Sequence, residues 1–357
     1  MSDTDDFHID KRRVRHAFDR AAADYDRVAV LQREVGTRLL ERLDYIRLQA
    51  HVIADIGAGT GHLSRALAQR YKKARVIATD LAPNMLRAAR RHAAPLARLL
   101  HRQSFVCGDA ERLPFASQTA DMIFSNLTLQ WCTDLDKAFA EFRRILNPGG
   151  LILFSTFGPD TLKELRDSWA QADLSNSLHR PPLSPRERDG VRGQGRTLTL
   201  SSERTRGEGQ SIQGASPQTS NEEDRGKEPG AVHVGAFIDM HDIGDALLRN
   251  GFADPVMDAE RFTLTYRDVY GVMNELKALG AHNAAAGRAR TLTGKGRLRA
   301  MVDAYERRRD NGLLPATFEV VYGLAWAPAV SALNTREEGV VKIPLTALQG
   351  RSPGGKS

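Results

Sequence analysis

The stretch Val52-Ile53-Ala54-Asp55-Ile56-Gly57-Ala58-Gly59-Thr60-Gly61 decides the fold of this chain. An apolar run that contains an acid leads into three glycines at alternate positions, and a helical pattern begins at His62. This order predicts a buried strand, a tight turn and a helix start. Glycine is needed where the backbone approaches a ligand closely or adopts a positive φ. In α/β proteins, such turns at the carboxyl ends of parallel strands bind nucleotides.

The spacing of the glycines separates this turn from two common phosphate-binding loops. Dinucleotide folds use G-x-G-x-x-G, and phosphate loops use G-x-x-x-x-G-K-[ST]. Here the pattern is D-x-G-x-G-x-G, with no lysine near it. An acid before the turn suits a cationic or amine-bearing ligand better than a pyrophosphate. A glycine-rich turn without a ligand is the alternative.

Three further apolar runs also end in polar residues. Asp80 closes the second run, 19 residues after Gly61, where an acid binds ribose hydroxyls in nucleotide folds. Its alternative role is a helix cap. Asp109 follows the third run and can accept a hydrogen bond from an adenine amino group. The fourth run ends in Ser125 and Asn126.

Together these motifs resemble the class I S-adenosylmethionine-dependent methyltransferases, over roughly residues 45–160. The resemblance implies an α/β fold: a seven-stranded, mostly parallel, Rossmann-like sheet with helices on both faces and an antiparallel last strand. It also implies S-adenosyl-L-methionine as the cofactor. The cofactor-binding residues would be Asp55, Gly57, Ala58, Gly59, Gly61, Asp80, Leu81, Met85, Asp109, Ala110 and Asn126.

A narrower resemblance runs over about residues 9–174 and 233–327. It is to the malonyl-acyl-carrier-protein O-methyltransferases of biotin synthesis. The matching segments are Phe18 to Tyr25, Ser125 to Cys132, Phe157 to Trp169, 237–244, 276–281, Arg288 and Leu292-Thr293.

This resemblance implies methyl transfer to the free carboxyl of a malonyl thioester on acyl carrier protein. Tyr25 and Gln130 would be catalytic, and Arg288 would bind the malonyl carboxylate. A carboxylate is already ionised at pH 7, so no strong general base is required. Two alternatives remain: a quinone-pathway methyltransferase, and a methyltransferase-like arginine hydroxylase of respiratory-complex assembly.

Composition and charge indicate where the protein acts and which ligands it lacks. The 357 residues carry a formal net charge of +7, and no run of 18 apolar residues predicts a transmembrane helix. The acidic first six residues resemble no targeting segment, so we expect a cytoplasmic protein. Cys107 and Cys132 lack metal-binding spacing and are expected to be reduced core residues. We expect no metal, and no motif indicates nucleic acid.

Basic residues gather between Arg288 and Arg309. Such a cluster is either a solvated helix face or a surface that steers an acidic carrier protein to the enzyme.

The chain divides into five predicted regions. Residues 1–44 form a helical lid, 45–174 the cofactor-binding core, 233–330 the rest of the fold with substrate-side helices, and 331–357 a flexible tail. Residues 175–232 contain no Phe, Tyr or Trp, and have too little apolar surface to offset the entropy of ordering. They predict a disordered insertion whose ends lie close together, where the family has a short connection.

Overall fold

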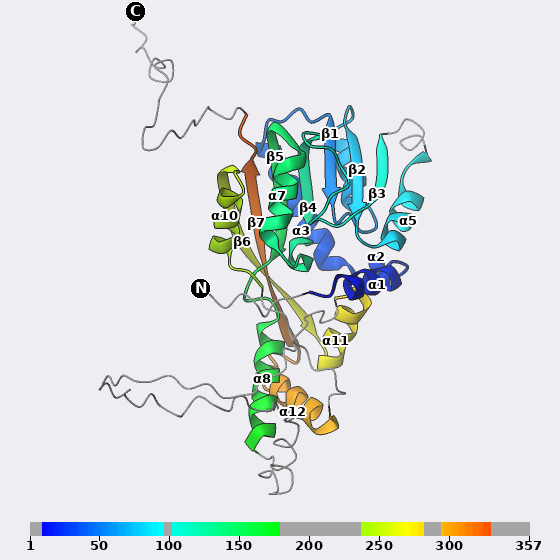
Figure 1. The fold of residues 1–357 in the computed structure, drawn as a ribbon. Coiled ribbons are helices and arrows are strands. Elements are labelled where there is room, and N and C mark those ends of the chain that lie inside the picture. The colour runs from blue at the N-terminus through cyan, green and yellow to red at the C-terminus, as the bar shows by residue number, and fades with distance from the viewer. Residues whose placement is uncertain (1–8, 96–101, 179–236, 282–293, 330–357) are drawn as a thin grey trace, which may run out of the picture.

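The computed structural model describes residues 9–95, 102–178, 237–281 and 294–329. Seven strands form one sheet in the order β3-β2-β1-β4-β5-β7-β6 (Figure 1). The strands are β1 Val52–Ile56, β2 Arg75–Asp80, β3 Gln103–Cys107, β4 Ala120–Asn126, β5 Leu146–Phe157, β6 Ala253–Tyr266 and β7 Leu314–Trp326. Only β7 runs antiparallel to its neighbours. The predicted class I methyltransferase sheet, with its antiparallel last strand, is confirmed.

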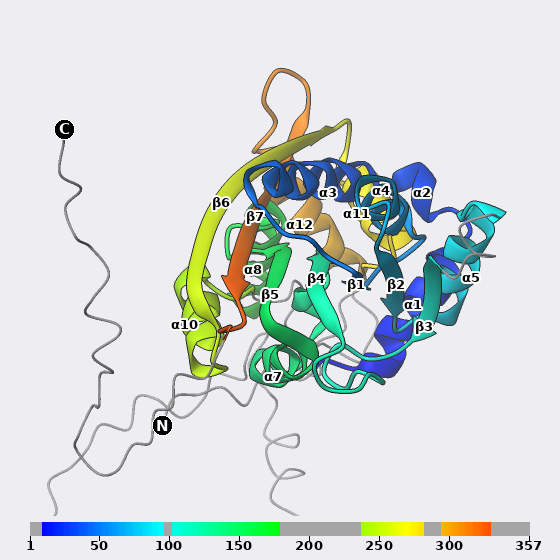
Figure 2. The same cartoon turned by 90° about the horizontal axis from the view of Figure 1, so that it is seen from above.

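Helices cover both faces of the sheet (Figure 2). The helices are α1 Lys11–Ala21, α2 Tyr25–Val28, α3 Val30–Glu41, α4 His62–Arg70, α5 Pro83–His92, α7 Leu135–Ile145, α8 Lys163–Leu178, α10 Met240–Arg249, α11 Val269–Ala278 and α12 Lys295–Glu306. Short 3₁₀ helices span Arg42–Tyr45 and Leu129–Trp131.

Alternation along the central strand β4 assigns its side chains to two cores. Met122 and Phe124 pack with α3 and α4, whereas Ile123 packs with α7 and α10. All three side chains are fully buried. Because β4 is apolar on both faces, it can lie in the centre of a sheet that is covered on both sides.

The β6–β7 hairpin is longer than the rest of the sheet. β5 ends at Phe157, which pairs with Val320, so β7 from Leu314 to Glu319 pairs with β6 alone. Helices α8, α11 and α12 pack on this extension, in the lower half of Figure 1. An isolated two-stranded ribbon is marginal in water, and these helices supply the apolar cover that it needs.

Hydrogen bonds fix the helices of the extension in place. Glu164 of α8 is buried and accepts from the backbone N–H of Thr317 at 3.0 Å. The hydroxyl of Tyr305 in α12 donates to the carbonyl of Pro315 at 2.9 Å. The predicted boundaries placed α8 with the cofactor-binding core, but it packs against α12. The extension therefore combines segments from both sides of the proposed insertion.

The described residues that flank the insertion bear on two expectations about it. Its predicted start at residue 175 falls inside α8, which continues to Leu178. The expectation that its ends lie close together involves residue 232, which lies outside the described residues. Phe237 packs against Phe157 at the end of β5, with ring centroids 5.7 Å apart, whereas α8 runs away from the sheet (Figure 1). Residues 179–232 and 331–357 lie outside the described residues.

The expectation of two core cysteines is wrong in part. Cys107 is exposed at the end of β3, and Cys132 is partly buried; neither forms a disulfide with a described residue. Burial raises the pKa of Cys132 to about 12, so this thiol stays protonated. The exposed position of Cys107 follows from its place at the carboxyl end of the edge strand β3.

Candidate active site

A pocket opens at the carboxyl ends of β1, β2 and β4, beneath α1. The space inside it, about 870 Å³, includes solvent at its open mouth. Its lining comes from strand ends, α1, α2 and the end of α11. The lining residues are Lys11, Val14, Phe18, Tyr25, Gln32, Ile56, Gly57, Gly59, Asp80, Leu81, Met85, Gly108, Asp109, Ala110, Asn126, Leu127, Thr128, Gln130, Trp131, Cys132, Phe157, Leu279 and Ala281.

The three glycines of the turn after β1 have different neighbours. All have positive φ: 75° at Gly57, 53° at Gly59 and 75° at Gly61. A Cβ on Gly57 would lie 1.9 Å from Thr128 Oγ1, and one on Gly61 would lie 2.8 Å from Ala89 Cβ. A Cβ on Gly59 would meet nothing nearer than Tyr25 Cε1 at 3.9 Å. Gly59 is therefore the glycine that keeps pocket space open.

Asp80 presents its carboxylate to this turn. One oxygen accepts the backbone N–H of Gly59 at 2.9 Å, and the other accepts that of Ala82 at 2.8 Å. Burial raises the pKa of Asp80 to about 6. The two N–H groups fix the carboxylate plane and leave further lone pairs for a ligand.

Three predicted cofactor residues lie outside the pocket lining: Asp55, Ala58 and Gly61. Asp55 is 1% exposed and accepts a hydrogen bond from the Ser64 hydroxyl of α4. Burial raises the pKa of Asp55 to about 7. Its carboxylate links the end of β1 to α4 through this hydrogen bond, so Asp55 stabilises the glycine turn between them.

Asp109 is held by α1. Its Oδ1 lies 2.7 Å from Lys11 Nζ, which also lies 2.9 Å from Glu111 Oε1. Burial would lower the pKa of Lys11, but its hydrogen bonds to the carboxylates of Asp109 and Glu111 contribute to raising it above its usual value. The hydrogen bonds that described residues donate to Asp109 all use Oδ1, which leaves Oδ2 for a ligand.

Aromatic side chains close the pocket on the α1 side. Phe18 packs edge-on against Trp131 at 5.4 Å and against Tyr25 at 6.4 Å between ring centroids. Within the described ranges, no residue hydrogen-bonds to the Tyr25 hydroxyl. Burial and the nearby Asp80 raise the pKa of Tyr25. The phenol therefore remains protonated and can act as a hydrogen-bond donor.

Gln130 and Asn126 line the pocket in fixed positions. The Gln130 Nε2 donates to the carbonyl of Leu127 at 2.7 Å, and its Oε1 accepts from Thr156 at 3.2 Å. The Asn126 Nδ2 donates to the carbonyl of Gln32 at 3.0 Å. Each amide thus has protein partners before any ligand binds. Arg288, the predicted substrate-binding residue, lies outside the described residues.

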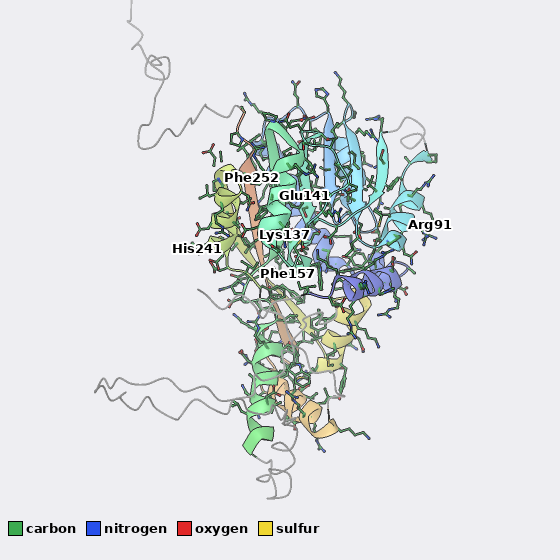
Figure 3. The ribbon with its side chains drawn as sticks, in the orientation of Figure 1. Arg91, Lys137, Glu141, Phe157, His241 and Phe252 are labelled. Atoms are coloured by element: carbon green, nitrogen blue, oxygen red, sulfur yellow. The ribbon has the colours of Figure 1, made fainter. Side chains whose placement is uncertain are left out.

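The sequence analysis did not single out several lining residues. Lys11 and Val14 lie on the inner face of α1, which apolar periodicity indicates, but periodicity does not say what that face covers. Leu279 and Ala281 come from the end of α11, where the backbone of Gly280 packs on Ala17. Phe157 closes the side nearest the β6–β7 extension (Figure 3).

The described residues contain no candidate for a metal site or for a membrane-spanning helix. No group of three or more His, Cys, Asp or Glu side chains in this part of the chain is arranged to hold a metal ion. None of the described helices is long and apolar enough to cross a membrane.

Comparisons with known proteins identify the family. Residues 54–154 match a model described as a methyltransferase domain. The Malonyl-[acyl-carrier protein] O-methyltransferase of Methylovorus sp. is 45% identical over 326 residues, covering 91% of each chain. That of Laribacter hongkongensis is 44% identical over 340 residues, covering 94% of this chain and 96% of its own.

A solved structure is similar at a much lower level. Haemonchus contortus phosphoethanolamine N-methyltransferase 2, in complex with S-adenosyl-L-methionine, has a TM-score of 0.41 and 16% identity. The match covers 87% of this chain and 57% of that one. The identity and coverage of the sequence relatives are decisive: the chain belongs to the malonyl-[acyl-carrier protein] O-methyltransferase family.

Proposed function

We propose that this protein transfers a methyl group from S-adenosyl-L-methionine to the free carboxyl of a malonyl thioester on acyl carrier protein. The observation that carries the proposal is the 45% identity, over 91% of the chain, to a relative named for this reaction. The pocket at the carboxyl edge of the sheet supports it. The product, a methyl ester, has lost a charge and suits chain-elongating enzymes of pimeloyl synthesis that act on apolar acyl chains.

The pocket fits the cofactor on features of the structure itself. Gly59 leaves space where any side chain would intrude. Asp80 has both oxygens oriented by backbone N–H groups, as bidentate binding of ribose hydroxyls requires. Asp109 Oδ2 can accept from an adenine amino group, and Leu81, Met85 and Ala110 give the lining an apolar part. These residues, with Gly57 and Asn126, are the proposed cofactor contacts.

The chemistry needs positioning more than proton transfer. The cofactor supplies an electrophilic methyl group on a sulfonium. The substrate carboxylate is ionised at pH 7, so the protein has to hold its oxygen in line and exclude water. The aromatic groups of Phe18, Trp131 and Phe157 line the reaction space, and Tyr25 supplies a protonated hydroxyl.

Recognition of the malonyl carboxylate calls for a cation. Among the described lining residues the cation is Lys11, whose charge is shared with Asp109 and Glu111. Ala281 lines the pocket, and Arg288 follows it in the chain. We therefore assign carboxylate binding to Arg288.

The test is methylation with labelled cofactor of malonyl-carrier and acetyl-carrier in parallel. Malonyl-carrier should be labelled and acetyl-carrier should not, because acetyl has no free carboxyl. Mild alkali should release the label as methanol, since the product is an ester. Label in both carriers or neither, or transfer to a quinone precursor instead, would refute the proposal.

Two variants should separate the roles of Tyr25 and Arg288. Tyr25→Phe should lower kcat about tenfold, as for the loss of one hydrogen bond of about 1.4 kcal/mol, with little change in cofactor affinity. Arg288→Gln should raise the KM for malonyl-carrier instead. Steady-state kinetics and calorimetry with the cofactor measure both. An unchanged kcat in Tyr25→Phe would show that the ring serves only for packing, and an unchanged KM in Arg288→Gln would remove its assignment.

A further inference from the structure

The predicted basic cluster near the C-terminus of the fold is partly ion-paired in the structure, and its members Arg288 and Arg290 lie outside the described residues. On and after α12, Arg297 pairs with Asp173, Arg308 with Asp167, and Arg309 with Glu306. Arg307 donates to Gln171 at 2.9 Å. Arg297, Arg307 and Arg308 join α12 and the turn after it to α8, whereas Arg309 pairs with Glu306 of α12. Lys295 and Arg299 are exposed and form no ion pair with other described residues.

On a second basic surface, most arginines have no acidic partner among the described residues. It consists of the exposed arginines of α1 and α5, here named the α1–α5 arginine surface. Within these two helices Asp19 is the single acid, against Lys11 and seven arginines, which gives a net charge of +7. This equals the formal net charge of the whole chain. The seven arginines are Arg12, Arg13, Arg15, Arg20, Arg87, Arg90 and Arg91.

Most of these charges are unpaired in the structure. Arg13 lies 3.5 Å from Asp10, and Arg15 lies 4.0 Å from Asp19, both as exposed pairs within one helix or its cap. Exposed pairs of this kind are weak. No described residue forms an ion pair with Arg12, Arg20, Arg90 or Arg91.

The two helices are joined to each other and to the pocket. Asp19 accepts the backbone N–H of Asn84 at the start of α5, at 2.8 Å. On their inner faces, Val14 and Phe18 of α1 and Met85 of α5 line the pocket. The arginines lie on the opposite faces, and Figure 3 shows Arg91 at the edge of the molecule. The surface is therefore the outer side of the pocket wall.

The composition of the surface favours a protein partner over a lipid bilayer. A helix that lies in a membrane interface presents an apolar face to the lipid. Here the apolar face of α1 covers the pocket, and the large exposed hydrophobic side chains of the described chain all lie outside α1 and α5. Unpaired arginines on the outer face instead match a surface rich in carboxylates.

We propose that the α1–α5 arginine surface docks the acidic carrier protein that presents the malonyl thioester. This inference rests on the proposed function. Complementary charge accelerates encounter and orients the partner. Because the same helices form the pocket wall, a carrier bound there is held beside the site that its acyl group must enter.

The test compares charge reversals on two surfaces, with two substrates. One variant combines Arg12→Glu, Arg20→Glu, Arg90→Glu and Arg91→Glu. The control combines Lys295→Glu and Arg299→Glu on α12, where the exposed cations are also unpaired among the described residues, and it is matched in charge by a second α1–α5 variant that carries only Arg90→Glu and Arg91→Glu. Each is assayed with malonyl-carrier and with malonyl-pantetheine, which has the same reactive group but no protein. Melting temperature and cofactor affinity verify that each variant is folded.

Both α1–α5 variants should raise the KM for malonyl-carrier, the combined variant about tenfold or more, as for a lost electrostatic steering field. Their turnover of malonyl-pantetheine should equal that of the wild type, and the α12 control should match the wild type with both substrates. The wild-type preference for the carrier should shrink as salt is added. Single Arg→Gln variants replace the combined variant if it does not fold.

Several results would overturn the proposal and leave the proposed function standing. These are an unchanged KM for malonyl-carrier in the α1–α5 variants, or the same rise in the α12 control as in the α1–α5 variant matched to it. Loss of binding to nucleic acid or anionic vesicles, with carrier kinetics unchanged, would assign the surface to that ligand. By contrast, a wild-type protein that methylates neither malonyl thioester would refute the proposed function itself.

Discussion

Gly57 and Gly59 have the same backbone handedness but different tasks. Both need a positive φ, which costs an L-residue about 1–2 kcal/mol. A Cβ at Gly57 would overlap Thr128, whereas a Cβ at Gly59 would point into pocket space beside Tyr25. The first glycine permits packing of the strand ends, and the second permits approach of a ligand.

Substitution by alanine should separate the two effects. Gly57→Ala should lower the melting temperature strongly, because overpacking adds about 1–3 kcal/mol to the φ cost. Gly59→Ala should lower it less and reduce cofactor affinity about tenfold or more, since about 1.4 kcal/mol corresponds to tenfold. Gly251→Ala is the control, because that glycine has φ of 74° and no atom within 4 Å of its added Cβ. Normal cofactor affinity in Gly59→Ala would contradict the proposed site.

Asp55 and Asp80 make the site sensitive to pH. Burial raises their pKa values to about 7 and about 6, above the usual value of 3.8. A carboxyl whose pKa is raised by folding binds protons more strongly in the folded state. Between its unfolded and folded pKa values, stability therefore falls as pH rises. Ligand binding through the Asp80 carboxylate has the opposite requirement, because it needs the ionised form.

The cofactor-free protein should therefore become more stable, and its cofactor affinity weaker, as pH is lowered from 8 through about 6. Melting curves and calorimetry across this range measure both trends. In Asp80→Asn the part of each trend due to Asp80 should vanish, although the amide can satisfy only one of the two N–H groups and absolute values will shift. An affinity that rises on acidification would show that the ligand does not bind the Asp80 anion.

At the scale of elements, α1 is fastened over the pocket at both ends. Lys11 binds Asp109 and Glu111 near its start, and Asp19 binds the N–H of Asn84 near its end. Its apolar face supplies Val14 and Phe18 to the lining. We expect this helix to open for cofactor entry and to close through the Lys11 ion pairs.

Lys11→Met keeps the aliphatic stem and removes the charge. Asp109 and Glu111 then lose a partner at 2.7 and 2.9 Å. Amide hydrogen exchange over residues 11–21 should accelerate, and the KM for cofactor should rise several-fold, with little change in melting temperature. Lys137→Met on α7 is the control, because that lysine is 70% exposed and its pair with Asp134 is a surface pair. Equal exchange rates in Lys11→Met and the wild type would show that the ion pairs do not hold α1.

Local patterns predict some of these elements and not others. The apolar runs before Gly57 and Asp80 predict β1 and β2, because the buried strand residues and the turn residues that end each strand are adjacent in the sequence. The short helix α2 is not predicted, because four residues are too few to show a helical period, and Ala29 departs from the helix only in its backbone angles. The packing of Gly280 on Ala17 of α1 depends on topology, which spacing does not encode.

At the scale of the whole molecule, two helical layers meet at the end of β5. The parallel part of the sheet holds the pocket, and the β6–β7 extension holds α8, α11 and α12. Phe157 joins them: it lines the pocket and packs against Phe318 of β7, with ring centroids 5.8 Å apart. The family resemblance predicted substrate-side helices after residue 233. However, α8, which precedes the insertion in the sequence, packs in the same helical layer as α11 and α12.

This arrangement sets a minimum length for the connection between α8 and Phe237. The 16 residues of α8 span about 24 Å, and the helix leads away from Phe157, which Phe237 contacts. An extended chain covers about 3.4 Å per residue, so about seven residues are the least that can return. A direct join of the insertion's ends would therefore strain the protein.

Two internal deletions test this length requirement. Deletion of 187–226 leaves 18 residues between Leu178 and Phe237, whereas deletion of 181–234 leaves four. The first should keep the wild-type melting temperature and methyl transfer, because loop length costs only about 0.6 kcal/mol per doubling and the removed stretch has no Phe, Tyr or Trp to pack. The second should melt lower or become insoluble, because four residues cannot span the helix without unwinding its last turns. Loss of folding in the longer-linked variant would show that 187–226 contributes to the core, and normal stability in the shorter one would mean that α8 does not need its full length.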